Sequence, residues 1–324
     1  MKRLRVIVVG VGVMGKYHAN VYAALPNVDL VAVVDPNPSR RCEAKEAYHC
    51  ATYPSLEAFL AETTADAASV AAPTSLHYSI TQQLLEAGIH TLVEKPVATE
   101  VKQARQLAML SQEKGLVLQV GHITRFFQAV DILNQQVSNP YLIEARRLTP
   151  YSRIRDVGVI LDLMIHDIDI VLGIISSDIE EISVSGHALN GSPHEDVAAA
   201  QIVFANGCIA RFLASRVAPD AERSLVVAEA NQTLRFDFAK EPHTEIAIFR
   251  PLQDEGAVSH VVVDRRVVAD ENPLRKELEH FLARIHHQAH PIGTLEDDLR
   301  SLDLAMRLQA QISDRNKSKI HIPH

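Results

Sequence analysis

The sequence predicts an α/β domain built on a parallel sheet, followed by an α+β domain built on a large, mostly antiparallel sheet. Short β-branched runs alternate with helical patterns over the first 121 residues, which is typical of βαβ units. A glycine-rich turn follows the first of these runs. After residue 122, strand-like runs follow one another directly, which favours antiparallel pairing. We therefore place one domain in 1–121 and a second in 122–324.

The first domain is expected to contain five strands with helices between them. The strands are predicted at Leu4–Val9, Leu30–Val34, Ala67–Ala71, Thr91–Val93 and Val117–Val120. Helical spacing of apolar residues is visible at Ile80–Ala87 and Val101–Lys114.

The second domain is expected to be a meander of strands with a few helices. Strands are predicted at Leu142–Leu148, Ile182–Ala188, Val197–Phe204, Cys208–Arg216, Ser224–Ala230, Thr233–Phe238, Thr244–Phe249 and Ser259–Val263. Helices are predicted at 158–175, Pro273–His287 and Leu295–Ser313, and whether the last of them packs back on the first domain is left open. Asn206-Gly207 is a hairpin signal between two of the strands.

The composition is that of an ordinary globular protein, with 47% hydrophobic and 22% charged residues. A net charge of -8 argues against a general nucleic-acid binder. Three cysteines without metal-site spacing fit a reducing compartment. No uninterrupted apolar run reaches the roughly 18 to 20 residues of a membrane span, and the basic, apolar N-terminus reads as a strand rather than a signal peptide. A cytoplasmic protein is expected.

A G-x-G-x-x-G turn connects the first strand to the first helix. It comprises Gly10, Gly12, Val13, Met14 and Gly15. Glycines at these positions allow a tight turn, close approach to a pyrophosphate and close helix packing, which predicts a Rossmann dinucleotide site. Asp35 follows the second strand about 20 residues later, where an acidic residue binds ribose hydroxyls, so NAD is favoured. Arg40 or Arg41 could instead reach the 2′-phosphate of NADP.

The predicted helix at 158–175 is apolar on nearly every face and yet carries four acidic or imidazole groups. Asp162, His166 and Asp169 stand at i, i+4 and i+7 and so share one face. Burying such groups is costly unless they are paired or used in chemistry. We interpret Asp162 and His166 as catalytic candidates, and Asp167 and Asp169 as structural pairing groups.

Four motifs in order resemble the glucose–fructose oxidoreductase / inositol dehydrogenase (Gfo/Idh/MocA) family. They are the glycine turn, Glu94-Lys95-Pro96, Gly121-His122-x-x-Arg125-Phe, and Asp162-x-x-x-His166. The resemblance covers essentially the whole chain. It implies a catalytic lysine at Lys95, with Asp162 and His166 facing the nicotinamide.

The resemblance also implies further cofactor contacts, because the family often has a Pro-x-x-x-His turn. The turn comprises Pro73, Thr74 and His77, and a purely structural role for it is left open. Glu94 and Lys95 of the Glu-Lys-Pro motif complete the expected cofactor contacts. Either His166, with an ordinary pKa near 6.5, or a desolvated Lys95 could be the base. Zinc would need a further ligand that the cysteine pattern does not offer, so no metal is expected.

Arginines cluster just before the 158–175 helix and suggest a phosphorylated substrate. Arg146, Arg147, Arg153 and Arg155 lie close together in the sequence, and Arg125 belongs to the same region by motif. Arginine forks suit phosphate oxygens, although salt-bridged surface arginines would give the same pattern. The expected substrate-binding set is His122, Arg125, Arg147, Tyr151, Arg153, Asp162 and His166.

Within the family, the stretch from Ile143 to Asp169 resembles a nucleotide-sugar branch. That resemblance implies NAD-dependent oxidation of the sugar 3-hydroxyl, with UDP-N-acetylglucosamine as the expected substrate and an aminotransferase as a possible next enzyme. A dehydrogenase of a free sugar or inositol is the alternative, and a nucleotide-binding sensor without turnover is a third possibility. A homodimer or homotetramer through the C-terminal sheet is expected.

Overall fold

The computed structural model describes residues 3–150, 156–189, 191–240, 242–254, 257–269 and 271–319. They form two compact units. The first unit joins Met1–Ile123 to Pro273–Leu299, and the second joins Thr124–Asn272 to Arg300–His324. Among the described residues, no helix combines the length and hydrophobicity needed to cross a bilayer.

The first unit is built on a parallel six-stranded sheet with the order β3-β2-β1-β4-β5-β6. Its strands are β1 (Leu4–Val9), β2 (Val28–Val34), β3 (Ala51–Tyr53), β4 (Ala67–Val70), β5 (His90–Glu94) and β6 (Leu118–Gly121). Its helices are α1 (Val13–Ala24), α2 (Pro38–Tyr48), α3 (Leu56–Glu62), η1 (Thr74–Leu76), α4 (His77–Glu86), α5 (Val101–Glu113) and α8 (Pro273–Ile285). This is the Rossmann strand order, with its switch point between β1 and β4.

The predicted parallel sheet is confirmed, and it has one strand more than expected. β1 has the predicted bounds, while β3 is a three-residue strand beside β2 that the sequence did not reveal. Three residues are too few for an alternating pattern, so their pairing depends on the neighbouring strand.

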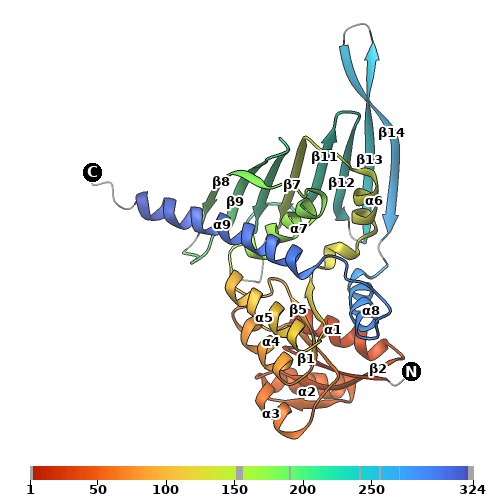
Figure 1. Ribbon diagram of the computed structural model, residues 1–324, viewed down its shortest axis with the longest axis vertical. Helices are drawn as coiled ribbons and strands as arrows, with labels where there is room; N and C mark the ends of the chain where they lie inside the picture. Colours follow the sequence, from red (N-terminus) through yellow and green to blue (C-terminus); the bar gives the residue numbers. More distant parts are fainter. Residues whose placement is uncertain are drawn as a thin grey trace. The chain divides into compact units, whose positions relative to one another are not determined.

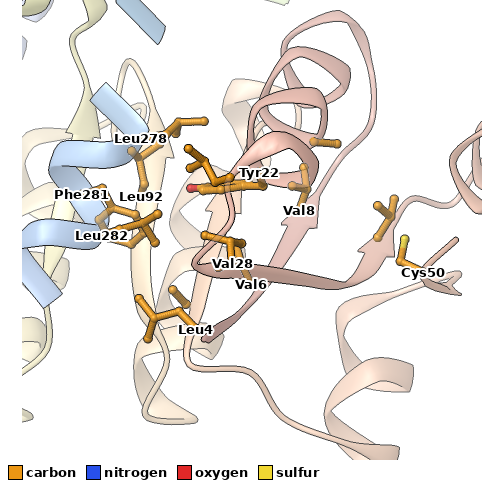
Figure 2. Close-up of a cluster of buried hydrophobic side chains, with 14 of the residues drawn as sticks. Leu4, Val6, Val8, Tyr22, Val28, Cys50, Leu92, Leu278, Phe281 and Leu282 are labelled. Atoms are coloured by element: carbon orange, nitrogen blue, oxygen red, sulfur yellow. The ribbon is translucent and has the colours of Figure 1, made fainter. Parts of the chain in front are cut away.

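Helix α8 completes the core of the first unit although it follows 124–272 of the second unit in sequence. Leu278, Phe281 and Leu282 are buried together with Val6 and Tyr22 of β1 and α1. Figure 2 shows the α8 side chains directed into this cluster. The sequence assigned 273–299 to the second domain, and that assignment is revised for this segment because its apolar face is buried in the first unit.

The second unit is built on an eight-stranded sheet with the order β14-β13-β12-β11-β7-β10-β9-β8. Its strands are β7 (Leu142–Leu148), β8 (Ile179–His187), β9 (Val197–Phe204), β10 (Ile209–Ser215), β11 (Glu222–Glu229), β12 (Gln232–Lys240), β13 (His243–Asp254) and β14 (Ala257–Ala269). Its helices are α6 (Gln128–Gln136), α7 (Ile165–Ile174) and most of α9 (Leu295–Lys319), and η2 (Ile123–Phe126) lies at its start. All pairs are antiparallel except β7 with β10, as predicted for a mostly antiparallel sheet.

One face of this sheet is covered and the other is open. Along β9 and β10, alternate residues such as Ala200 and Phe212 are buried, whereas Gln201 and Arg211 are exposed. α9 runs across the covered face (Figure 1), and a side-chain carbon at Gly186 of β8 would lie 2.4 Å from Ile312 of α9. The alternation follows from the two-residue period of a strand.

Candidate active site

The candidate cofactor residues of the first unit all follow the carboxyl ends of parallel strands. Val9 pairs with Val34 and with Val70, and Glu94 pairs with Gly121, so the strand ends are neighbours in register. Ligands of open α/β sheets bind at this edge. The sheet therefore brings the glycine turn, Asp35, the 73–77 turn, Glu94-Lys95 and His122 to one edge.

The three glycines of the turn meet three different surroundings. Gly10 has φ +85°, and a side-chain carbon there would lie 2.8 Å from the backbone of Ala71 and Ala72. At Gly15 that carbon would lie 1.8 Å from the carbonyl oxygen of Gly10, so α1 packs tightly on the turn. At Gly12 no atom of the described residues would lie within 4 Å of that carbon. The open space lies at the position where the backbone must approach a pyrophosphate.

The start of α1 has no side-chain cap. Gly12 is its N-cap residue, and no acidic residue stands in the first turn. The first N–H groups of a helix have no partner within the helix, and they favour a phosphate group. Val13 is exposed and Met14 is partly buried at this helix start. The turn therefore fits a dinucleotide.

Asp35 is buried and fixed by backbone donors. Its Oδ2 accepts a hydrogen bond from Val11 N at 2.9 Å and its Oδ1 accepts one from Asn37 N at 2.8 Å. Arg40 Nη1 lies 3.7 Å from Oδ2, and Arg41 donates to the carbonyl oxygens of Asp35 and Pro36. Both arginines therefore contact the segment around Asp35, and backbone donors fix the carboxylate at the end of β2.

His77 ties two of the edge segments together. Its ring is buried, with Nδ1 2.7 Å from Pro96 O and Nε2 2.9 Å from Ala72 O. Burial lowers the pKa of His77 despite these two contacts. A neutral ring carries one N–H and donates to one of the two carbonyl oxygens. Thr74 is buried in the short helix before it, and Pro73 is exposed.

Glu94 is the last residue of β5 and Lys95 follows it, and both are partly buried. Glu94 Oε1 lies 3.0 Å from Nε2 of the fully buried His18 of α1. Burial raises the pKa of Glu94, but the His18 hydrogen bond and the charges of His18, Lys95 and His77 outweigh it, so the net shift is downward. The carboxylate beside Lys95 is therefore negative at neutral pH.

His122 follows β6 at the same edge. It is buried, and its Nε2 lies 3.7 Å from Oδ1 of Asp298, which is also buried. Asp298 stands in the first turn of α9. The predicted role of His122 in substrate binding stays a prediction.

In the second unit, the segment predicted as one helix at 158–175 consists of two kinds of helix. A π-type turn, η3 (Ile160–Met164), precedes α7. Asp162 lies in the π-type turn and is buried, with its N–H donating to Gly158 O at 3.0 Å. His166 stands in the first turn of α7 and is partly buried. π-type turns are rare and are often found at functional sites.

The two other aspartates of this segment pair with arginines. Asp167 accepts hydrogen bonds from Arg147, the shortest at 2.6 Å, and both are nearly buried. Asp169 accepts two from Arg125, at 2.8 and 2.5 Å, and one from Ser301 Oγ at 3.1 Å. These are the pairing roles that the sequence predicted for both aspartates.

The expectation of an arginine cluster for phosphate is not supported by the described arginines. Arg147 points to the covered face of the sheet, where Asp167 occupies its guanidinium, and Arg146 points to the open face and pairs with Glu222. Because neighbouring residues of a strand point to opposite faces, the two arginine side chains are separated, and each pairs with a different carboxylate. Arg125 is held by Asp169 in the same way. Tyr151, Arg153 and Arg155 lie outside the described residues.

Sequence reasoning missed two sets of residues that support the site. Glu195 accepts a hydrogen bond from Ile160 N at 3.2 Å, and a side-chain carbon at Gly158 would lie 2.0 Å from its carboxylate, so this carboxylate caps the helix that carries Asp162. His18 forms the second set through its contact with Glu94. Both contacts join residues that are far apart in sequence, so no local sequence pattern predicts them.

Similarity to known proteins agrees with this geometry. Residues 4–122 match the model of an oxidoreductase family with an NAD-binding Rossmann fold, and residues 134–235 match the GFO/IDH/MocA C-terminal domain. The chain is 36% identical over 240 residues to UDP-N-acetylglucosamine 3-dehydrogenase from Acidithiobacillus ferrooxidans, which covers 74% of this chain and 75% of the relative. A solved structure of that enzyme superposes with a TM-score of 0.84 at 31% identity, over 96% of this chain and 98% of the other.

A second relative is D-glucoside 3-dehydrogenase from Escherichia coli. It is 35% identical over 143 residues, which cover 44% of this chain and 41% of the relative. Together with the family models, the full-length likeness and the glycine turn at the edge of a parallel sheet, these findings lead to one assignment. The chain belongs to the Gfo/Idh/MocA family of NAD-dependent oxidoreductases.

Proposed function

We propose that this protein oxidises the 3-hydroxyl of a nucleotide sugar, UDP-N-acetylglucosamine, to the 3-keto sugar. The likeness to UDP-N-acetylglucosamine 3-dehydrogenase carries the proposal, because it extends over both units. The relative from Escherichia coli also acts at a sugar 3-position, by its name. The 3-keto product has the carbonyl group that an aminotransferase requires, so such an enzyme would consume it.

The glycine turn and the start of α1 would hold the pyrophosphate of NAD, and Asp35 would hold the adenosine ribose. When bound there, NAD would supply the acceptor for the hydride that leaves the carbinol carbon. The hydroxyl proton must leave with it, so that a ketone forms. Lys95 and His166 share this proton transfer in the proposal: a lysine ammonium stabilises developing alkoxide charge, and an imidazole accepts a proton near neutral pH. Asp162 binds a neighbouring hydroxyl or orients His166.

The turnover assay follows reduced nicotinamide with NAD and a set of alcohols. UDP-N-acetylglucosamine is compared with free N-acetylglucosamine, methyl glucoside and inositols. We expect kcat/KM at least about a hundredfold higher for the nucleotide sugar, since a uridine diphosphate group adds several polar contacts. NMR of the product then identifies the oxidised carbon. Equal kcat/KM for the free sugar would contradict the nucleotide-sugar assignment.

A free-polyol substrate is the second candidate. A scyllo-inositol 2-dehydrogenase from Bacillus subtilis is 25% identical over 348 residues, which cover 99% of this chain. Because the described arginines near α7 are paired with carboxylates, they do not favour a diphosphate over a polyol. Faster turnover of an inositol than of the nucleotide sugar would decide for this candidate.

The shared proton transfer is tested by substitution at each residue. We expect Lys95→Ala and His166→Ala each to lower kcat about 10²- to 10⁴-fold, which is the usual effect of removing a general acid or base. NAD affinity, measured by fluorescence titration, should change little for His166→Ala. Near wild-type turnover of both variants would contradict the assignment.

We also propose that the open face of the eight-stranded sheet contacts a second copy of the chain. This face carries a hollow of about 830 Å³ lined by small and charged side chains of β7 to β12, including Arg146, Glu144 and Arg211. Its alternating charges could pair across a two-fold axis. Light scattering of wild type and of Ala199→Glu, which adds a charged side chain on this face, would measure the mass. A monomeric wild type would contradict the proposal.

A further inference from the structure

His18 is a fully buried polar residue without an obvious structural task. It stands on α1, three residues after Gly15, and its Nε2 lies 3.0 Å from Oε1 of Glu94. Its Nδ1 has no hydrogen-bond partner among the described residues. An apolar side chain would fill this place without leaving a buried nitrogen unsatisfied. Packing of the core alone therefore does not explain a histidine at this position. A buried nitrogen without a hydrogen-bond partner indicates that the residue has another role.

The tautomer follows from the contacts. A carboxylate accepts hydrogen bonds, so Nε2 carries the proton and donates it to Glu94. The histidine acts as a single donor directed at one carboxylate oxygen.

Glu94 is also confined from the other side. A side-chain carbon at Gly121 of β6 would lie 3.2 Å from the Glu94 carboxylate, so the glycine leaves just enough room for it. The side chain of Glu94 is only 13% exposed. The carboxylate is thus held between the end of β6 and the buried face of α1.

The groups that face Glu94 among the described residues set its charge. They are His18 from α1, His77 from α4 and the adjacent Lys95. The ring of His77 is already engaged by Ala72 O and Pro96 O. Burial raises the pKa of Glu94, and the His18 hydrogen bond is the largest influence that lowers it again. The negative charge beside Lys95 therefore depends on a residue of the cofactor-binding helix.

We propose that His18 is a positioning residue for the oxidation: by donating to Glu94 it keeps a negative carboxylate beside Lys95, and so sets the pH range in which Lys95 works. The inference rests on the proposed role of Lys95. Removing a negative charge beside an ammonium group favours its neutral form. In either role of Lys95, as a cation or as a base, the limb of the pH profile that reports it then moves to lower pH.

The test compares His18→Leu with His18→Gln in the full-length protein. Leucine fills the space without a donor, whereas the Nε2 of glutamine can reach the place of the imidazole Nε2. We expect His18→Leu to lower kcat about tenfold and to move the Lys95 limb of kcat/KM about one pH unit downward, with KM for the alcohol little changed. His18→Gln should restore most of the rate and the profile.

A double-mutant cycle with Glu94→Gln separates positioning from general structural support. If His18 acts through Glu94, His18→Leu has little further effect on kcat in the Glu94→Gln background. An unchanged pH profile in His18→Leu, or the same loss of rate in both backgrounds, would overturn the inference. So would a His18→Gln variant as impaired as His18→Leu.

A measurement without turnover separates this inference from the proposed function. Carbon-detected NMR of ¹³C-labelled glutamate carboxyl groups follows the titration of Glu94, which Glu94→Gln identifies. We expect Glu94 to titrate at higher pH in His18→Leu than in wild type. If no alcohol is oxidised, the proposed function fails while this titration still supports or overturns the His18–Glu94 link. If another alcohol is the substrate, the kinetic test is run with it.

Discussion

Gly12 and Gly15 stand three residues apart in one turn, and a side chain would have opposite consequences at the two positions. At Gly15 it would collide with the carbonyl oxygen of Gly10, whereas at Gly12 it would enter open space. The first glycine thus serves the ligand and the second serves the fold. The spacing alone predicted the turn, but this division of labour is visible only in the structure.

The division predicts opposite effects of two alanine substitutions. Gly12→Ala should lower NAD affinity about tenfold or more while changing the melting temperature little, since its methyl group lies where the pyrophosphate approaches. Gly15→Ala should destabilise the protein by about 1–3 kcal/mol through overpacking. Calorimetry and fluorescence titration of NAD measure the two effects. A Gly12→Ala variant that binds NAD like wild type would contradict the assignment of the open space.

Asp196 illustrates a buried charge that supports the fold. Its Oδ1 accepts a hydrogen bond from Arg216 Nε at 2.7 Å and its Oδ2 accepts one from Leu189 N at 2.7 Å. Burial raises the pKa of Asp196, but these hydrogen bonds and the charge of Arg216 outweigh this effect, so the pKa lies below its ordinary value. A carboxyl group with a lowered pKa in the folded state stabilises it above the unfolded pKa and loses this effect as pH falls through the folded pKa.

Asp196→Asn should therefore cost about 3–5 kcal/mol at neutral pH, because it breaks a buried pair of opposite charges. The difference from wild type should begin to shrink as pH falls below about 4, the pKa of Asp in an unfolded chain, and should shrink further as pH falls through the lowered pKa of folded Asp196. Urea unfolding over a pH series measures it. The exposed pair of Glu222 with Arg146 is the control, and Glu222→Gln should cost about 1 kcal/mol or less. A pH-independent cost of Asp196→Asn would contradict the linkage.

At the scale of elements, the sequence predicted strands better than the details of the key helix. β1, β7 and β9 have the predicted bounds, since each is a β-branched or alternating run between turn signals. The 158–175 segment was predicted as a regular helix, whereas it begins with a π-type turn whose Ile160 N donates to Glu195 on another segment. Local periodicity cannot reveal a distant cap.

Gly158 and Glu195 are coupled in this cap. A methyl group at Gly158 would lie 2.0 Å from the Glu195 carboxylate and would displace it from Ile160 N. We expect Gly158→Ala to cost about 1–3 kcal/mol. In a Glu195→Ala background the same substitution should cost much less, because the obstacle is gone. Urea unfolding of the four proteins measures the coupling, and additive costs would contradict it.

At the scale of the whole molecule, the first unit is discontinuous in sequence. The apolar face of α8 was recognisable from its spacing, but the sequence could not show which core receives it. For the same reason, the sequence predicted that Asp167 would pair with another group, but it did not show that Arg147 would be its partner. Sequence patterns indicate which face of an element is buried, and the topology of the fold decides which other elements it packs against.

Phe281 of α8 provides the test of this arrangement. It is fully buried with β1 and α1 side chains, so Phe281→Ala should destabilise the first unit by about 3–5 kcal/mol. Because NAD binds this unit, saturating NAD should recover part of the loss. Phe281→Leu, which keeps most of the volume, should cost less than about 1.5 kcal/mol. A Phe281→Ala variant as stable as wild type would contradict the assignment of α8 to this core.

The return of α8 to the first unit has a consequence for biosynthesis. During translation, the whole of 124–272 is synthesised before Leu278 and Phe281 are added. Most N-terminal domains fold as soon as they have been synthesised. Here the apolar surface of Val6 and Tyr22 stays incompletely covered until α8 has been synthesised. Helix α8, which is synthesised late, therefore completes the core of the unit that is synthesised first.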